Sequence, residues 1–462
     1  MRRPLLLTTM AAAALLAGCA NLAPSFERPA PTLRSDWAAP TSATATAPAD
    51  IPWRDFITDD RLRQAIQAAL ANNRDLRVAV LNVERARALY RIEAAAGQPQ
   101  LEAAAGATRQ RTAGSAGSTS TQLQVQLGLA SYEIDLFNRL GNLSDAALAS
   151  YFAVEENRHA AQISLVAELA QAWLTLAADQ ARLQLAQDTL ASQQASYDLT
   201  RRSQALGGAS GLTVLQAQTT VDAARGEVAR YRAQLALDQN ALELLVGQPL
   251  ETGWLPAAGG AVQASLLPAL PAGLPSELLQ RRPDVRAAEQ TLRAANADIG
   301  AARAALYPRI QLTAAAGTQS SSLAGLFGAG SAAWSIAPRI SLPIFDGGAA
   351  RANVQLSEAQ QAITVAQYEK TLQTAFREVA DALAVRGNLG EQLAAQQSLT
   401  EASARALALS EAVFRNGASS YLEVLDAQRA LYAAQQALIT LRVAEQANRV
   451  TLYRVLGGWV VG

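Results

Sequence analysis

The sequence is poor in the side chains from which redox, metal and most catalytic sites are built. Its 462 residues include one cysteine, Cys19, one histidine, His159, and two methionines. A single chain therefore cannot form a two-cysteine redox site or a Cys/His zinc site. His159 lies in a long polar helical run, which is typical of a solvated surface histidine. Because no nucleophile–base pair or metal-ligand constellation is left to propose, the sequence predicts no enzyme, no cofactor and no metal site.

Aromatic residues and net charge are also scarce. Aromatic residues make up 5% of the chain, and 39 basic residues balance 39 acidic ones. The balanced charge argues against a nucleic-acid binder. Half of the residues are apolar, and many of these are alanine, which favours helices packed closely side by side over a core of bulky side chains.

Long apolar runs are missing apart from a short one at the N-terminus. Two arginines precede this run, which is the layout of a secretory signal and is too short for a spanning helix. It ends in Leu16-Ala17-Gly18-Cys19, which resembles a bacterial lipobox; the alternative is a buried free cysteine. The resemblance implies that residues 1–18 are a signal peptide, that Cys19 is lipidated, and that Ala20, in place of an aspartate, directs the protein to the outer membrane. No later stretch is expected to span a membrane as a helix.

One stretch of the sequence occurs twice. A glycine turn that restarts a helix lies at Gly417 and again at Gly207, 210 positions earlier (417 − 207). Glycine supplies the backbone freedom that ends one helix, and Ser419 or Ser420 can cap the helix after the second turn. Other landmarks recur at an offset of 209 or 210, so the sequence predicts two similar halves.

Composition marks the segments around these halves. Residues 20–57 are rich in Pro, Ala and Thr and are expected to be extended and without a core, and a Pro/Gly/Ala-rich stretch makes a linker. Acidic residues at 59–60 and Asn73 suit the starts of the first helices. The predicted order is a signal peptide at 1–18, a lipidated tail at 19–58, a first repeat at 59–247, a linker at 248–275, a second repeat at 276–457 and a C-terminal tail at 458–462.

Each repeat contains a stretch in which the apolar period changes from helical to two. In residues 122–129, leucine and valine alternate with glutamine or glycine, which predicts a strand with one apolar and one polar face. A weaker alternation at 101–107 precedes it, and the second repeat has similar runs at 310–316 and 334–344. Each repeat thus predicts one β-hairpin, at about 99–134 and about 308–345.

The hairpins fit a membrane barrel better than the edge of a soluble sheet. Their polar face holds Gln, Ser, Thr and Gly, and Tyr132, Tyr307 and Trp334 lie near strand ends, where membrane barrels place aromatic girdles. Four strands cannot close a barrel, because about eight is the smallest common number. If the strands cross a membrane, several chains must share one barrel, and three copies would supply twelve strands.

A very long helix is predicted after each hairpin, at residues 140–206 and 349–415. Each range holds 67 residues, or ~100 Å of helix at ~1.5 Å per residue. Apolar residues recur in both at spacings of three and four with polar gaps, and such narrow seams suit helices packed sideways into a tube. The seam residues are Val166, Leu169, Trp173, Leu176, Leu183 and Leu190 in the first helix and Leu372, Phe376, Val379 and Leu383 in the second.

Four short motifs make the pattern specific: Tyr132-Glu133-Ile134-Asp135-Leu136-Phe137, Arg281-Arg282-Pro283-Asp284-Val285, Ala305-Leu306-Tyr307-Pro308-Arg309 and Ser341-Leu342-Pro343-Ile344-Phe345-Asp346-Gly347-Gly348. With them the chain resembles the outer-membrane factor family, the TolC-like channels, and within it the lipoprotein branch that serves resistance-nodulation-division efflux pumps. The resemblance covers nearly the whole chain after the signal. It implies a mainly α-helical protein with a membrane β-barrel, built from two tandem repeats and assembled as a homotrimer that shares a 12-stranded β-barrel and a long periplasmic α-helical barrel.

The resemblance also implies a function and partners. The trimer would be a passive exit duct for small toxic or amphiphilic compounds in a Gram-negative cell, with its barrel in outer-membrane lipid. Its closed periplasmic end would open when a periplasmic adaptor (membrane fusion protein) and an inner-membrane resistance-nodulation-division pump dock.

The resemblance places a periplasmic gate at the start of the last helix. In the family's Leu-Asp-Ala-Gln-Arg motif, the aspartate and arginine, with a leucine four residues before the aspartate, form the constriction, and the matching residues are Leu422, Asp426 and Arg429. The alternative is an ordinary solvated pair, worth only ~0.2–0.5 kcal/mol. The first repeat has Gln216 and Thr219 at the charged positions, so the second repeat is expected to be the moving half.

Adaptors are expected to contact both glycine turns. Family members often have an arginine and an aromatic residue before the first turn and an acidic residue after it, whereas this chain has Ser203, Gln204 and Thr213. The contact at the first turn is therefore expected to be weaker or differently specified. The expected contact residues are Gly207, Gly208, Gly417 and Ser419.

Two other functions are compatible with parts of the sequence. The same architecture could serve type I protein secretion, against which the lipobox weighs, because the lipoprotein branch mostly serves efflux pumps. A periplasmic coiled-coil scaffold lipoprotein would explain the helices but not the alternating strand. Metal efflux is disfavoured by the small number of methionines and the single histidine.

Overall fold

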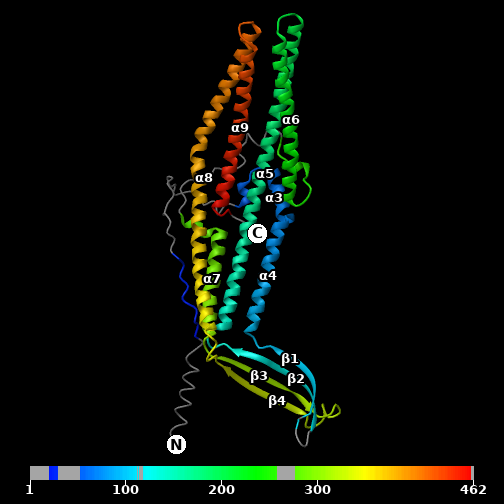
Figure 1. Ribbon diagram of the computed structural model, residues 1–462, viewed down its shortest axis with the longest axis vertical. Helices are drawn as coiled ribbons and strands as arrows, with labels where there is room; N and C mark the ends of the chain where they lie inside the picture. The colour runs from blue at the N-terminus through cyan, green and yellow to red at the C-terminus, as the bar shows by residue number, and fades with distance from the viewer. Residues whose placement is uncertain (1–19, 30–51, 112, 114–117, 258–275, 459–462) are drawn as a thin grey trace. The chain divides into compact units, whose positions relative to one another are not determined.

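The computed structural model describes residues 20–29, 52–111, 113, 118–257 and 276–458 (Figure 1). The expected signal peptide and Cys19 lie outside the described residues. The chain divides into two compact units. Unit 1 comprises residues 1–31, 81–155 and 286–370, and unit 2 comprises residues 32–80, 156–285 and 371–462.

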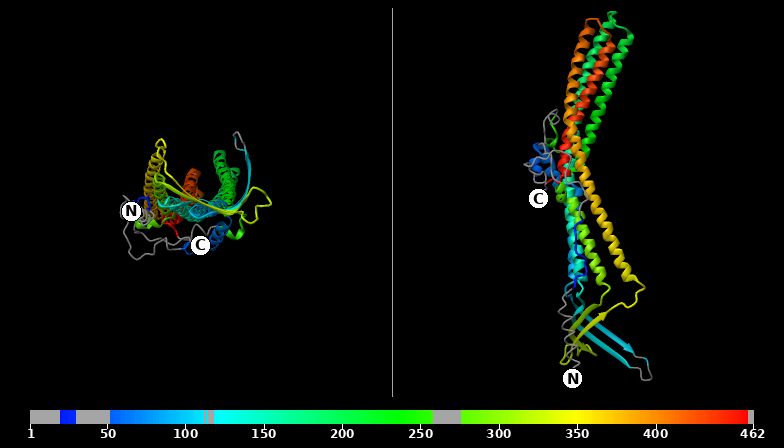
Figure 2. Two further views of the ribbon diagram at one scale, coloured as in Figure 1. Left: turned by 90° about the horizontal axis from the view of Figure 1, so that it is seen from below. Right: turned by 90° about the vertical axis from the view of Figure 1, so that its left-hand side faces the viewer.

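Unit 1 contains a four-stranded antiparallel sheet, in which the strands follow one another in chain order. The first repeat supplies β1 (Leu101–Arg111) and β2 (Thr119–Ile134), and the second supplies β3 (Arg309–Ser320) and β4 (Ala332–Ser341). The two hairpins meet where β2 pairs with β3, with the register shifting between Leu129 and Tyr132. The sheet is curved (Figure 2), and β1 and β4 are its edges.

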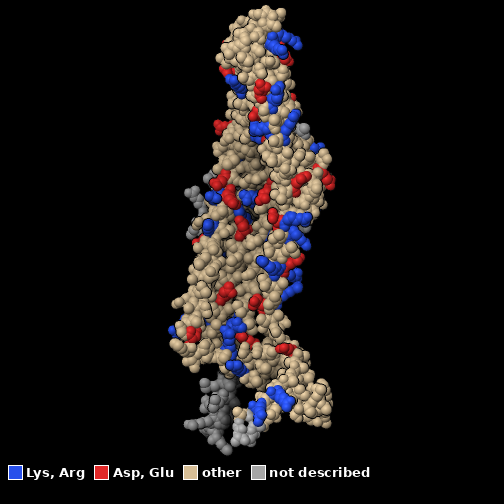
Figure 3. Space-filling model, turned by 45° about the vertical axis from the view of Figure 1, so that its right-hand side comes forward, with Lys and Arg blue, Asp and Glu red and all other residues tan. Residues whose placement is uncertain are grey.

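The strands have the expected exposed apolar side chains. Leu127 projects from β2, and Trp334, Ile336 and Ile340 project from alternate positions of β4, all largely exposed in the single chain. Figure 3 shows few charged side chains over the strands, whereas charged residues are spread along the helices. The strand expected over residues 334–344 was wrong at one end: β4 stops at Ser341, which pairs with Arg309, the first residue of β3, so no partner strand continues beyond it.

The helices of unit 1 pack through small residues. They are α7 (Pro283–Ala304) and the adjoining parts of α4 (Arg74–Ala96), α5 (Arg139–Ala205) and α8 (Ala349–Arg415). One buried cluster between them consists of alanine side chains, which allow close approach of two helix backbones. These are Ala146 and Ala149 of α5 and Ala294 and Ala297 of α7.

Two aspartates start the long helices of the two repeats. The Asp135 carboxylate accepts from the N–H groups of Arg139, Leu140 and Gly141 at 2.6, 2.8 and 3.0 Å. Asp346 accepts from the N–H groups of Gly348 and Ala350 at 2.9 and 2.7 Å. A carboxylate that binds several free N–H groups of a first turn stabilises the helix at its positive end. Both residues belong to motifs that the sequence singled out.

Unit 2 holds two helical hairpins. The first joins α5 to α6 (Gly211–Val246) and the second joins α8 to α9 (Tyr421–Val455). Both α5 and α8 have 67 residues, and each lies within one residue of the range predicted from the sequence. The seam residues pack as predicted: Leu169, Trp173 and Leu176 of α5 and Leu372 and Val379 of α8 are buried.

Short elements precede and follow the first helical hairpin along the chain. Before it lies α3 (Asp60–Asn72), which Asp59 caps by accepting from two N–H groups, and after it lie η2 (Thr252–Trp254) and η3 (Ser276–Arg281). The Trp173 indole donates to the Trp254 carbonyl at 2.9 Å. The start of the expected linker thus contributes to the core of unit 2 through one buried indole contact.

Two expectations need correction. Residues 20–57 were expected to have no core, but α2 (Trp53–Phe56) lies within them, with Trp53, Phe56 and Ile57 buried and Phe56 stacked 4.1 Å from Tyr453. The Pro/Ala/Thr-rich composition gave no sign that these aromatic residues are buried, or that Phe56 stacks on a residue far along the chain. The second correction concerns α5, which contains one stretch apolar enough to pass as a membrane span, although 61% of that stretch is buried inside the chain. Its hydrophobicity is that of a helix packed among others.

Candidate functional site

The two glycine turns have the same backbone geometry. Gly207 and Gly417 both have a positive φ, +79° and +71°, which strongly favours glycine. In the first turn, the N–H groups of Gly207 and Gly208 donate to the carbonyls of Gln204 and Ser203 at 2.9 and 2.8 Å. In the second turn, the bonds recur 210 positions later at 2.9 and 3.1 Å. This is the double hydrogen bond of a Schellman motif, and it leaves both turns exposed.

The helices after the two turns begin differently. Ser210 caps α6 by accepting from the Thr213 N–H at 3.1 Å. Ser420 precedes α9 without a side-chain cap. Among the described residues, the partly buried Ser419 hydroxyl has no hydrogen-bond partner. The expectation that Ser419 or Ser420 caps α9 is therefore wrong, because neither side chain reaches a first-turn N–H.

The start of α9 is held by an apolar cluster in unit 2. Tyr421, Val424 and Leu425 of α9 are buried together with Ala217 of α6. Tyr421 packs at a tilt against Phe414 of α8, with ring centroids 5.4 Å apart. This cluster determines which face of α9 packs against α6 and α8 and which face is exposed.

The three proposed gate residues share the opposite, exposed side of α9. Leu422 is 51% exposed, and Asp426 and Arg429 have side chains 66% and 65% exposed. An Arg429 guanidinium nitrogen lies 3.5 Å from an Asp426 carboxylate oxygen. Spacings of four and three place all three residues along one stripe of a helix. The stripe can therefore meet other molecules or chains without disturbing the packed face.

The first turn presents a neutral version of this stripe. Leu212, which is 210 positions before Leu422, is also exposed. Gln216 and Thr219 replace the charged pair, and the Thr219 hydroxyl donates to the Gln216 carbonyl at 2.7 Å instead of to another side chain. The geometry of the two turns is thus repeated, whereas their charge is not.

Sequence reasoning gave no role to Arg282, which lies in one of the quoted motifs. Arg282 is buried, and its guanidinium binds Asp284 at 2.7 Å, Glu378 at 2.8 Å and the Val455 carbonyl at 2.9 Å. It thereby joins the start of α7, the middle of α8 and the C-terminal end of α9 within unit 2. The Arg-Pro-Asp order was the available signal, because an arginine before a helix-starting Pro-Asp can bind that aspartate.

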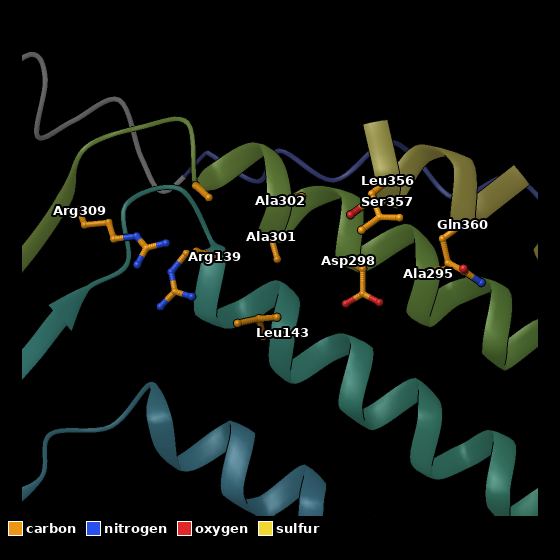
Figure 4. A pocket seen from close by; sticks show the side chains of 11 residues that line it. Arg139, Leu143, Ala295, Asp298, Ala301, Ala302, Arg309, Leu356, Ser357 and Gln360 are labelled. Atoms are coloured by element: carbon orange, nitrogen blue, oxygen red, sulfur yellow. The ribbon is translucent and has the colours of Figure 1, made fainter. Parts of the chain in front are cut away.

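A cavity of about 460 Å³ in unit 1 is lined by α5, α7 and α8 (Figure 4). Its floor is formed by alanines of α7, and Arg139, Asp298 and Arg309 supply its charges. Arg139 is already paired with Glu133 at 2.8 Å, and desolvation raises the pKa of the Asp298 carboxyl. This set holds no nucleophile next to a base. In the described part of the chain, no three His, Cys, Asp or Glu residues are grouped to hold a metal ion.

Comparison with known families decides between the remaining functions. The sequence profile described as "Outer membrane efflux protein" matches residues 65–248 and 274–458, one match for each repeat. The chain belongs to the outer membrane efflux protein family. The toluene efflux pump outer membrane protein TtgC of Pseudomonas putida is 44% identical to it, over 98% of this chain and 95% of that protein. The outer membrane protein OprJ of Pseudomonas aeruginosa is 43% identical, over 99% and 97%.

Solved structures agree with the family assignment. The open state of the MtrE outer membrane channel of Neisseria gonorrhoeae is similar to this chain, with a TM-score of 0.88 and 37% identity, over 95% of this chain and 98% of that one. This outer membrane efflux protein is therefore a channel of a tripartite pump and not an enzyme. It is a trimer in which three four-stranded sheets share one twelve-stranded barrel. The scaffold alternative is excluded, because it does not explain the sheet.

Proposed function

We propose that the trimer exports small toxic or amphiphilic organic compounds, receiving them from a periplasmic adaptor and an inner-membrane resistance-nodulation-division pump. Support comes from relatives that are about 44% identical and are named for the efflux of toluene, antibiotics and solvents. Protein secretion by a type I system is less well supported, because these relatives are named for efflux pumps. The energy comes from the pump, and the channel contributes a path and a gate.

The gate consists of Leu422, Asp426 and Arg429 from three copies. The observation that carries this proposal is the exposed Asp426–Arg429 pair on α9, which the first repeat lacks at the same offset. In a closed trimer, each arginine can pair with an aspartate of a neighbouring copy, and three leucines narrow the opening. Pairs between chains, partly removed from water, are stronger than the exposed pair within one helix. Docking of the adaptor then has to break these contacts.

The gate is tested by single-channel conductance in planar bilayers. The double variant Asp426→Ala/Arg429→Ala removes the pairs and should raise the conductance of the isolated trimer several-fold. The matched control is Gln216→Ala/Thr219→Ala, which changes the equivalent positions of the first repeat and should leave conductance unchanged. Unchanged conductance in the charged double variant would show that Asp426 and Arg429 are an ordinary surface pair.

Both glycine turns are proposed as adaptor contacts, through Gly207, Gly208, Gly417 and Ser419. Gly207, Gly208 and Gly417 are exposed at the turns, and Ser419 is half-buried, with a buried hydroxyl that has no hydrogen-bond partner among the described residues. A helical partner can approach an exposed glycine turn closely, because glycine carries no side chain. The second turn leads into the charged pair of Asp426 and Arg429, whereas the first leads into neutral residues, which agrees with a weaker contact at the first turn.

Cys19 is proposed as the site of lipid attachment to the outer membrane. The neighbouring Ala20 N–H donates to the Leu136 carbonyl at 3.0 Å, just beyond the end of β2 at Ile134. The segment then follows α7, where Arg28 pairs with Glu289 at 2.8 Å. An acyl chain attached before Ala20 would therefore start close to a strand end, where a membrane barrel meets the lipid headgroups.

Lipidation is tested by metabolic labelling with a fatty-acid analogue. The wild-type protein should be labelled, and Cys19→Ser should abolish the labelling because no other thiol exists in the chain. Trimer formation by the variant, followed by size in detergent, controls for folding. Labelling that persists in Cys19→Ser would remove the lipoprotein proposal.

A further inference from the structure

A pair of buried aspartates joins the two helices of the first hairpin in unit 2. Asp179 of α5 is 5% exposed and Asp238 of α6 is 9% exposed. Their carboxyl groups lie within hydrogen-bonding reach of each other. Two ionised carboxylates in such a site repel each other and have no donor between them, so sites of this kind hold a proton.

The surrounding hydrogen bonds leave one oxygen without a donor. Gln234 donates to Asp238 Oδ1 at 2.9 Å, and Arg182 donates to Asp179 Oδ1 at 2.7 Å. Asp238 Oδ2 is fully buried and finds no partner among the described residues. One proton shared with Asp179 would satisfy this atom. Burial raises the pKa of the Asp238 carboxyl, Gln234 lowers it, and Asp179 raises it again.

The second hairpin shows that the packing does not require carboxyl groups. At the offset of 210, Leu389 replaces Asp179 and Asn448 replaces Asp238, and both are buried. The Asn448 amide donates to the Ala382 carbonyl at 3.0 Å, so this position is satisfied without any titratable group. The same helical frame thus accepts a leucine and an amide, and the carboxyl pair is a specific property of the first hairpin.

We propose that Asp179 and Asp238 form a proton-binding site that controls how firmly the first hairpin holds α9. The link is Arg182, whose second nitrogen donates to the Thr440 hydroxyl of α9 at 2.9 Å. With the proton bound, Asp238 is neutral and Arg182 stays shared between Asp179 and Thr440. When the proton leaves, Asp238 becomes a second carboxylate that competes for Arg182 and repels Asp179, which loosens both α5–α6 and α5–α9.

The charged groups that act on Asp238 are few. They are Asp179 and Arg182, both from α5, while α6 contributes the neutral Gln234 amide and α9 the neutral Thr440 hydroxyl through Arg182. A carboxyl whose folded-state pKa is raised contributes stability that is fully present below its unfolded pKa and is lost as the pH rises through the folded value. Acid therefore stabilises the closed first hairpin. As the pH rises from the unfolded-state pKa of Asp238 to its folded-state pKa, the equilibrium constant for opening the hairpin increases by up to about tenfold per pH unit.

Infrared spectroscopy of the purified trimer tests the bound proton directly. The spectrum of Asp238→Asn is subtracted from that of the wild type at each pH, which removes the bands of other protonated carboxyl groups such as Asp298. The difference should show the carbonyl band of a protonated carboxylic acid that disappears as the pH is raised. The matched control is Asp188→Asn, because Asp188 accepts from Gln184 at 2.9 Å in the same i−4 arrangement but is exposed. The spectrum of this control should keep the Asp238 band. If Asp238→Asn fails to assemble, Asp179→Asn replaces it and should move the disappearance of the band to lower pH, because an amide in place of the second carboxyl group can donate to Asp238.

Amide hydrogen exchange tests the consequence for the helices. At each pH, the exchange of α6 and of α9 around Thr440 is compared between wild type and Asp238→Asn, which cancels the intrinsic pH dependence of exchange. Exchange in the wild type should become faster than in Asp238→Asn as the pH rises, and the two should converge in acid. A difference spectrum between wild type and Asp238→Asn without the carbonyl band, or an exchange ratio that does not vary with pH, would overturn the proposal. Neither readout depends on the gate or on pump partners.

Discussion

In each repeat, the shorter helix of the helical hairpin, α6 or α9, ends at a backbone carbonyl that accepts a hydrogen bond from a buried polar side chain. That side chain comes from near the start of the same repeat. In the first repeat, the Asn73 amide donates to the Leu245 carbonyl at 2.8 Å. In the second repeat, the Arg282 guanidinium donates to the Val455 carbonyl at 2.9 Å. The two bonds occupy equivalent places, 209 and 210 positions apart (282 − 73 and 455 − 245), but one uses a neutral group and the other a charge.

This difference shows how a duplicated fold acquires unequal parts. Asn73 also caps α4 by accepting from the Leu76 N–H at 2.8 Å, so it joins the start of α4 to the end of α6 through neutral bonds. Arg282 additionally binds Asp284 and Glu378 and therefore holds three helices. Each repeat thus closes its hairpin by the same backbone contact, and the second repeat adds an ion-pair network around it. The repeat with the proposed gate is therefore the one whose helices are joined by the ion pairs of Arg282.

The largest effect is expected from Arg282→Ala. The variant leaves the Val455 carbonyl and the Glu378 carboxylate without their buried partner, and we expect it to lower the free energy of unfolding by about 3 kcal/mol. Asn73→Ala removes one neutral bond and one cap and should cost about 1–2 kcal/mol. Urea denaturation of the trimer in detergent, followed by circular dichroism, measures both. Equal losses would mean that the charge network adds nothing to the shared backbone contact.

A smaller effect is expected from alanine at the two turns. Gly207→Ala and Gly417→Ala each force a side chain into a positive φ, which costs about 1–2 kcal/mol, and an added Cβ meets no atom within 4 Å at either position. The two variants should therefore lose similar stability.

The turns are expected to differ in function. Gly417→Ala should reduce cross-linking to the proposed periplasmic adaptor and the tolerance of cells to toxic organic compounds more strongly than Gly207→Ala. The reason is that the second turn leads into the helix with the proposed gate. A larger loss for Gly207→Ala would reverse the assignment of the two repeats.

The smallest effect is expected from Glu289 of α7, which has an apolar counterpart, Val80, 209 positions earlier (289 − 80). Burial opposes ionisation of Glu289, but its bonds to Arg293 and Arg28, at 2.9 and 3.0 Å, lower the pKa of the carboxyl overall. Its contribution to stability is therefore present above the ordinary glutamate pKa and is lost as the pH falls through the lowered value.

Glu289→Gln should accordingly be less stable than wild type near neutral pH and nearly equal to it in acid. Thermal unfolding at a series of pH values measures the difference. Val80→Gln serves as the control at the equivalent place of the first repeat and should shift stability by an amount that does not depend on pH. A pH-independent difference for Glu289→Gln would show that its ion pairs contribute nothing measurable.

Much of the fold could be predicted because its signals are periodic. The alternation of residues 122–129 predicted β2, and the three-four spacing that includes Leu169 and Trp173 predicted α5 to within one residue. The boundary of β4 was missed because the apolar alternation continues past Ser341, whereas the partner strand β3 begins only at Arg309. The core role of Trp53 and Phe56 was missed because a few aromatic residues in a Pro-rich segment have no period, and Tyr453, on which Phe56 stacks, lies far away in the sequence.

The candidate site, like the fold, was predicted from the sequence only in part. The resemblance supplied the positions Asp426 and Arg429, and the structure shows that both are exposed on one side of α9. Arg282 and the Asp179–Asp238 pair were missed, because a buried charge and an exposed one look alike in a sequence. Only the packing of several helices shows which charges are removed from water.

The sequence by itself determined the local structure and its repetition. Strand and helix periods, the positive-φ glycines and the two aspartates at the starts of the long helices all act over a few residues, and each recurs in the second repeat. The tertiary structure alone decided the chemistry of the contacts between helices. Whether Asp238 meets Asp179, or Arg282 meets Glu378, depends on residues about 60 to 100 positions apart (238 − 179 and 378 − 282). Such pairs are set by burial and desolvation, which no single segment of the sequence can reveal.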